Sequence, residues 1–159
     1  MSGLLGERFG VTPEIVAGSN TTYTEASDDT VENCLDSRVT VPGRPPAGLT
    51  YRYKLAGTKT GANDNHTVLL VLDGTTIMTL TADDGTAVDW VAEFTVRFTD
   101  SQTQKVMGYM VANTCDGEVD YAAGAVDCTA ETVLEVRITN TDASDTTTCE
   151  MLTCEKWVF

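Results

Sequence analysis

The sequence contains a single histidine, His66, at the end of a polar segment formed by Asn63, Asp64, Asn65 and His66. Amide, carboxylate and imidazole groups side by side can hydrogen-bond a sugar or another polar molecule, so this segment is a possible ligand loop. Nucleophilic catalysis would require a base beside a Ser or Cys nucleophile. No Ser-His-Asp or Cys-His pattern surrounds His66, and a lone histidine in a polar loop is typical of a solvated side chain. The sequence therefore predicts no catalytic residue.

Neighbouring carboxylates occur at three places, which are Asp28-Asp29, Asp83-Asp84 and the group Asp116, Glu118 and Asp120. Adjacent Asp residues are typical of turns, because the short side chain hydrogen-bonds its own backbone. Calcium is the alternative, since this ion prefers hard oxygen ligands. None of the three groups follows the EF-hand or the nonapeptide calcium pattern, and Gly57 to Gly61 lacks the spacing of a phosphate-binding loop. The sequence thus predicts neither a metal site nor a cofactor.

The chain has five cysteines, which are Cys34, Cys115, Cys128, Cys149 and Cys154. An odd number does not fit a complete disulfide framework, and in a reducing compartment we expect them to be buried as small hydrophobic residues. A late disulfide, for example between Cys115 and Cys128, remains open. Cys149 and Cys154 are expected on opposite faces of one strand, which is unsuitable for sharing a zinc ion.

The charge of the chain restricts its partners. Its 159 residues include 24 acidic and 10 basic ones, for a net charge of −14. Such a chain repels phosphate groups, so we expect neither nucleic acid nor an anionic membrane as a partner. The start of the chain lacks the basic and long apolar regions of a secretory signal. The longest apolar run, Val68–Leu72, is much shorter than a membrane span.

Alternating hydrophobicity predicts about eight strands. The clearest is Asp89–Thr99, in which Trp90 and every second residue to Phe98 are apolar. Asp73-Gly74 is a hairpin signal, and Gly57–Asn65 and Asn113–Asp127 are expected loops. The other expected strands are Ser37–Val41, Leu49–Leu55, Val68–Leu72, Ile77–Leu80, Lys105–Ala112, Glu131–Thr139 and Thr147–Phe159. The pattern predicts an all-β fold, an antiparallel two-sheet β-sandwich that is jelly-roll-like.

Residues 1–33 are expected to form an extended N-terminal arm ahead of a β-sandwich domain at 34–159. The arm is rich in Gly, Ser, Thr and Asp, with irregularly spaced apolar residues. Thr12 as a cap, Pro13 in the first turn and Gly18 as a stop predict one short helix in it. An arm that cannot form its own core lies either on its own domain or on a neighbouring subunit.

The middle of the chain, Gly57–Phe98, resembles a β-sandwich module of tailed-bacteriophage structural proteins, which occurs in tail fibres, head fibres and capsid decoration proteins. The matching motifs are the aromatic strand Tyr51–Leu55, Gly57-Thr58-Lys59-Thr60-Gly61, Asp73-Gly74-Thr75, and Asp89-Trp90 opening a long strand. The stretch around Gln104 fits as well, whereas Asp64 stands where the pattern usually has Gly. The resemblance covers about half of the chain.

The resemblance implies trimers that pack around a three-fold axis, no enzyme activity and no fixed ligand residues. We therefore expect a capsid decoration (cement) protein, made in the host cytoplasm, that binds the outer surface of a phage head and stabilises it. Its partners would be the major capsid protein and itself, as a homotrimer. The arm and the basic front end would bind the capsid through Leu4, Leu5, Arg8, Phe9, Ile15, Arg38 and Arg44. Arg52 and Lys54 would also pair with capsid carboxylates.

The main alternative is a receptor- or glycan-binding module of a phage fibre or tail tip. The segment Asn63, Asp64, Asn65 and His66 would then form the sugar site. A hydrolase is a poor hypothesis, because the sequence offers no convincing nucleophile and base. A secreted, disulfide-bonded sandwich lacks a signal and has an odd number of cysteines.

Overall fold

The fold was analysed in a computed structural model that describes residues 13–19, 23–26, 32–33, 37–61, 65–82, 87–112, 118–140, 142 and 144–158. The described residues form strands and connections and contain no helix. The strands are β1 (Glu14–Ser19), β2 (Tyr23–Ala26), β3 (Glu32–Asn33), β4 (Val39–Val41), β5 (Thr50–Thr60), β6 (His66–Leu72), β7 (Thr75–Ala82), β8 (Ala87–Phe98), β9 (Gln104–Ala112), β10 (Glu118–Gly124), β11 (Thr132–Asn140) and β12 (Thr146–Trp157).

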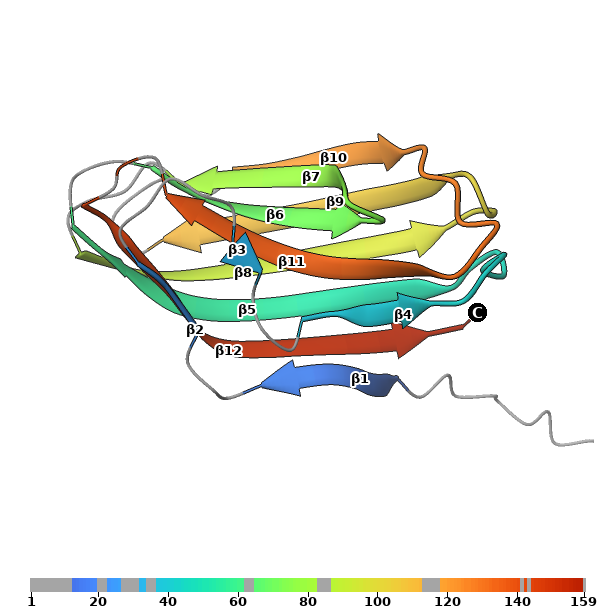
Figure 1. Ribbon diagram of the computed structural model, residues 1–159, viewed down its shortest axis with the longest axis horizontal. Coiled ribbons are helices and arrows are strands. Elements are labelled where there is room, and N and C mark those ends of the chain that lie inside the picture. Colours follow the sequence, from blue (N-terminus) through green and yellow to red (C-terminus); the bar gives the residue numbers. More distant parts are fainter. Residues whose placement is uncertain are drawn as a thin grey trace, which may run out of the picture.

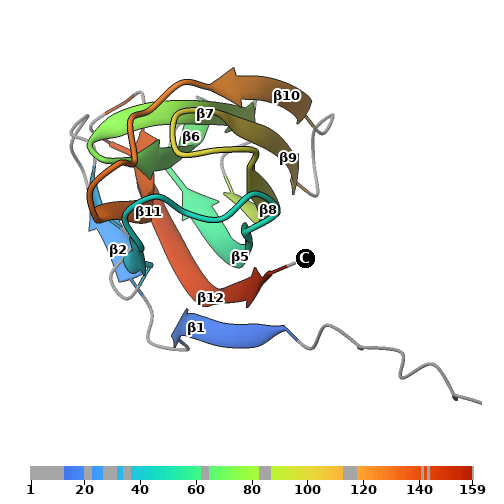
Figure 2. The same cartoon turned by 90° about the vertical axis from the view of Figure 1, so that its right-hand side faces the viewer.

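Two antiparallel sheets pack face to face (Figures 1 and 2). The seven-stranded sheet has the order β1-β12-β5-β8-β9-β10, and β2 pairs with β12 on the same edge as β1. The five-stranded sheet has the order β3-β11-β6-β7, and β4 pairs with β11 beside β3. The chain crosses between the sheets after β2, β4, β5, β7, β10 and β11. The expected all-β, jelly-roll-like sandwich is confirmed.

The core lies between the sheets and follows the period of the strands. In β8, Trp90, Phe94 and Phe98 are buried and face the five-stranded sheet. Tyr53 of β5 crosses the core, because its hydroxyl donates to the carbonyl oxygen of Ser37 at 2.6 Å and approaches that of Leu134 at 3.2 Å. A buried phenol needs such partners, so this tyrosine ties the two layers together.

The hairpin between β6 and β7 turns at Asp73 and Gly74, as the sequence predicts. Both residues have positive φ, 49° and 74°, which is the backbone that a two-residue type I′ turn requires. The apolar run Val68–Leu72 falls within β6, which lies between β11 and β7 inside its sheet.

Two expected loops are in part strands. β5 continues through Thr60, so the segment after Gly57 extends the sheet instead of leaving it. β10 (Glu118–Gly124) pairs with β9 over its whole length, inside a segment that the sequence predicts as an acidic loop. Its polar and small residues gave no burial signal, because the strand lies at a sheet edge and is mostly exposed.

The predicted helix from Thr12 to Gly18 is wrong, because Glu14–Ser19 forms β1 against β12. The β-branched Ile15 and Val16 suit a strand, and sheet pairing outweighs the local helix signals. The described parts of the predicted arm thus belong to the sheets of this same domain. The first twelve residues lie outside the described ones.

The expected positions of Cys149 and Cys154 on opposite faces are also wrong. The register of β12 shifts between Cys149 and Met151, and such a bulge inserts one residue and reverses the alternation. Both cysteines therefore face the core and are buried, as is Cys128. All three are free thiols, as expected for cysteines used as small hydrophobic residues.

Candidate binding surface

The apolar side chains exposed on this domain are concentrated on one sheet. Within the described part of the chain, every exposed large hydrophobic side chain that lies in a strand belongs to the seven-stranded sheet. These residues are Ile15, Val91, Met107, Tyr109, Val111, Val119, Tyr121 and Met151. They point away from the core, on what we call the outer face. A clustered apolar surface of this kind marks an interaction site more often than scattered exposed residues do.

The densest apolar part of the outer face lies on β8, β9 and β10. Val91 stands opposite Val111, Tyr109 opposite Val119, and Met107 opposite Tyr121. Directly opposed side chains on one face of an antiparallel pair are in reach of each other. These six residues therefore form one continuous surface, which we call the apolar patch. Val119 and Tyr121 are its most exposed members, at 77% and 61%.

A charged network occupies the centre of the outer face, beside the apolar patch. Arg52 of β5 donates two hydrogen bonds to the carboxylate of Glu93 in β8, each 2.6 Å long. These bonds raise the pKa of the Arg52 guanidinium, the side-chain hydrogen bond being the largest cause. Tyr109 donates to the same carboxylate at 3.4 Å. In the neighbouring pair, Lys54 lies 3.2 Å from Glu155.

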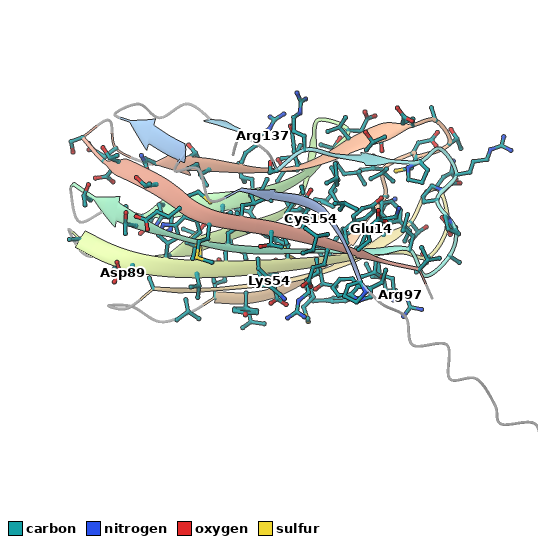
Figure 3. The ribbon with its side chains drawn as sticks, turned by 90° about the horizontal axis from the view of Figure 1, so that it is seen from below. Glu14, Lys54, Asp89, Arg97, Arg137 and Cys154 are labelled. Carbon is teal, nitrogen blue, oxygen red and sulfur yellow. The ribbon has the colours of Figure 1, made fainter. Side chains whose placement is uncertain are left out.

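Two basic residues, Arg97 and Lys105, lie on the outer face beyond the charged network, and we call them the basic row. Arg97 of β8 stands directly opposite Lys105 of β9, and both are exposed. A hollow of about 430 Å³ is lined by Arg97, with Met107 and Trp157 among its other lining residues. A second hollow, of about 460 Å³, is lined by both Arg97 and Lys105. Figure 3 shows Asp89, Lys54 and Arg97 along this side of the sandwich and Arg137 on the opposite side.

The outer surface of the five-stranded sheet is different in character. Thr79 of β7 is exposed there, and Arg137 of β11 pairs with Glu135 at 2.5 Å. Glu135 also lies 2.8 Å from Arg38. Among the described residues, this surface has no exposed large hydrophobic side chain. The two layers thus differ, because only the outer face of the seven-stranded sheet combines exposed large apolar side chains with charged ones among the described residues.

The predicted capsid-binding residues are spread over several places. Leu4, Leu5, Arg8 and Phe9 lie outside the described residues. Ile15 is 70% exposed on β1 and belongs to the outer face. Arg38 is paired with Glu135 on the other layer, and Arg44 is exposed in the connection after β4, where its φ is 54°. The structure therefore does not bring these residues together into one surface.

The predicted ligand loop is only partly described. Asn63 and Asp64 lie outside the described residues, and Asn65 is half-buried. His66 is the first residue of β6 and is fully buried, with its ring 5.4 Å from that of Trp90. The expectation of a solvated histidine is therefore wrong. His66 faces inward because the period of β6 places it in phase with the buried Val68.

The apolar patch was missed from the sequence, although β9 carries a signal for it. Along β9 the buried positions alternate with exposed ones, and the exposed ones include Met107, Tyr109 and Val111. A strand with one solvated face normally places polar residues at such positions. An apolar run on both faces of an expected strand therefore points either to double-sided burial or to an interface.

The described residues contain no group of three His, Cys, Asp or Glu side chains that could hold a metal ion. Nor does the described chain include a helix long and apolar enough to cross a membrane. Of the acidic residues considered above, Glu118 and Asp120 are described. The carboxylate of Glu118 accepts a hydrogen bond from the backbone of Thr81, and that of Asp120 accepts one from the backbone of Tyr121.

The fold and its surface define a two-sheet β-sandwich in which the exposed large apolar side chains of the described strands all lie on one sheet. No protein-family model matches the chain, and no curated protein matches its sequence. Among solved structures, it is similar to a legume lectin-like domain from Entamoeba histolytica, with 6% identity and a TM-score of 0.36. The match covers 79% of this chain and 88% of that one.

Proposed function

We propose that this chain is a non-enzymatic structural protein that works by docking the outer face of its seven-stranded sheet on other protein subunits. The observation that carries the proposal is the one-sided distribution of exposed apolar side chains over the two layers. Burial of apolar surface supplies most of the favourable free energy of protein association. Aromatic residues and Met, which the apolar patch contains, are enriched in interfaces.

The more specific form of the proposal is a capsid decoration protein on the exterior of a phage head. The resemblance of Gly57–Phe98 to the phage structural module supports this form, and so does the acidic charge, which keeps the chain away from the packaged genome. The partners would be the major capsid protein and further copies of this chain in a homotrimer. A protein that binds only the assembled head stabilises it by mass action.

The proposal is tested by adding the purified chain to phage heads that have been assembled in its absence, from a phage genome in which its gene is deleted. Occupancy is measured by co-sedimentation and by imaging of the particles. We expect the wild-type chain to bind and Tyr109→Glu with Met107→Glu to bind at least about tenfold less, because each substitution places a charge in the apolar patch. Thr79→Glu, an exposed position on the other layer, is the matched control for an added charge.

Three results would overturn the proposal in different ways. If the wild-type chain leaves heads undecorated, the capsid form fails. If the patch variant binds as well as Thr79→Glu, the outer face is not the docking surface. If the isolated chain instead adsorbs to host cells or binds a glycan array, the receptor-binding alternative replaces it.

A further inference from the structure

Arg97 and Lys105 are an unusual pair on this protein. They stand directly opposite each other on neighbouring antiparallel strands, so their Cα atoms are about 4.5–5.5 Å apart. Like charges in this position repel and destabilise the sheet. No carboxylate of a described residue lies within 4.0 Å of either side chain. Both side chains are exposed on the outer face.

The other cations of the outer face are already paired. Arg52 holds Glu93 with two hydrogen bonds, and Lys54 lies 3.2 Å from Glu155. The chain has 24 acidic residues and 10 basic ones, so carboxylates are plentiful. Among the described residues, no carboxylate pairs with these two adjacent cations, so both charges are available to an anion from outside the chain.

The surroundings of Arg97 leave room for a ligand. Arg97 lines both the hollow of about 430 Å³ and the hollow of about 460 Å³. The first is bordered by Met107 and Trp157, which offer an apolar wall, and the second by Lys105. Lys105 also lies over the ring of Tyr121, with its Nζ 5.9 Å from the ring centroid, which connects the basic row to the apolar patch.

We propose that Arg97 and Lys105 bind a carboxylate of an acidic protein segment, and that a neighbouring apolar side chain of the same segment fills the hollow between Met107 and Trp157. A guanidinium binds a carboxylate through two parallel hydrogen bonds, and the ammonium adds a third. The shared carboxylate also removes the repulsion between the two cations. This inference rests on the proposed function for the identity of the segment, which belongs to the surface that the outer face docks on.

An acidic protein fits this site better than a nucleic acid does. Duplex DNA carries about one negative charge per 1.7 Å of its axis, so its binding needs an extended row of cations. The outer face offers two unpaired cations, followed in the neighbouring rows by Glu93 and Glu155. With a net charge of −14, the chain would repel a phosphate backbone beyond these two contacts.

The test is a titration of the full chain, followed by NMR, with a short capped peptide of alternating Glu and Leu. We expect shifts at the side chains of Arg97, Lys105 and Trp157, and none with the matching Gln and Leu peptide. Arg97→Gln with Lys105→Gln should bind the acidic peptide at least about tenfold more weakly. Arg137→Gln, on the opposite layer, should bind as the wild type does.

Several outcomes would overturn the inference. These are equal shifts with the Gln peptide, equal binding by the double variant, or tighter binding of a single-stranded oligonucleotide than of the acidic peptide. Because both cations are exposed, their replacement should leave the fold intact, which circular dichroism checks. The peptide titration needs no phage head, so its result is independent of the decoration experiment. Loss of head binding with peptide binding retained would contradict the proposed function alone.

Discussion

Arg52 and Glu93 form a two-point ion pair across β5 and β8, with Nε to Oε1 and Nη2 to Oε2 both at 2.6 Å. The side chain of Glu93 is only 10% exposed, whereas that of Arg52 is 37% exposed. The carboxylate is therefore held in a largely desolvated position under the guanidinium and the Tyr109 hydroxyl. This pair thus lies directly beside the apolar patch, which it contacts through Tyr109.

Replacement of Arg52 by Met should destabilise the domain by about 1–2 kcal/mol, because it leaves a nearly buried carboxylate without its main partner. Loss of one partner from a fully buried pair costs about 3–5 kcal/mol, and the partial exposure of Arg52 reduces this. Urea unfolding measures the change. Lys54→Met is the control, since its pair with Glu155 is more exposed and should contribute less than about 1 kcal/mol. Equal losses for the two variants would contradict the prediction.

The ion pair of Lys59 and Asp145 should contribute more to the stability of the domain than the Arg52–Glu93 pair does. Both of its side chains are fully buried, and they lie 3.2 Å apart. Lys59→Met leaves the buried carboxylate of Asp145 without this cation, which we expect to cost about 3–5 kcal/mol. Adding Asp145→Leu to the same chain should restore part of the loss, since no buried charge then remains unpaired. Thermal unfolding of the single and double variants measures both effects. A double variant less stable than Lys59→Met would show that packing dominates at this end of the sandwich.

The layered β-sandwich could be predicted from the sequence because burial has period two in its long strands. Trp90, Phe94 and Phe98 in β8 and Leu134, Val136 and Ile138 in β11 are buried as their alternation indicates. Such a pattern depends on local sequence alone. The turn at Asp73-Gly74 was likewise predictable, since its backbone demands a particular pair of residues.

The docking surface could not be predicted in the same way, because it depends on which strands become neighbours. Arg97 and Lys105 are eight residues apart in the sequence and meet only through the register of β8 with β9. The number of basic residues near the start of the chain favours the front end as the docking surface. In the structure, however, Arg38, Arg52 and Lys54 are paired within the chain. The bulge in β12 and the pairing of β1 are also tertiary effects that no local pattern shows.

Gly57→Ala should destabilise the domain strongly, because β5 passes close to the bulge of β12 at this residue. A Cβ at position 57 would lie 1.8 Å from the backbone oxygen of Thr148 and 2.8 Å from Cζ2 of Trp90. Neither neighbour can move without disturbing the sheet or the core, so we expect a loss of about 1–3 kcal/mol or an unfolded protein. Gly74→Ala is a useful comparison, since no atom lies within 4 Å there and its cost comes from the backbone, with φ at 74°.

The stability of the domain should fall steeply at alkaline pH. Burial raises the pKa of Tyr51 and of Cys154 to about 12, and it raises that of Tyr53 far above its ordinary value. Since the folded state favours the protonated forms, their contribution is complete below the unfolded pKa values of 9.0 for Cys and 10.0 for Tyr, and it is lost as the pH rises toward 12. These groups should therefore leave the urea midpoint of unfolding unchanged between neutral pH and pH 9.0 and lower it at higher pH. Tyr51→Phe should make the decline in unfolding free energy shallower by up to about 1.4 kcal/mol per pH unit, which is the slope that the loss of one proton gives. An unchanged slope in that variant would contradict the role assigned to Tyr51.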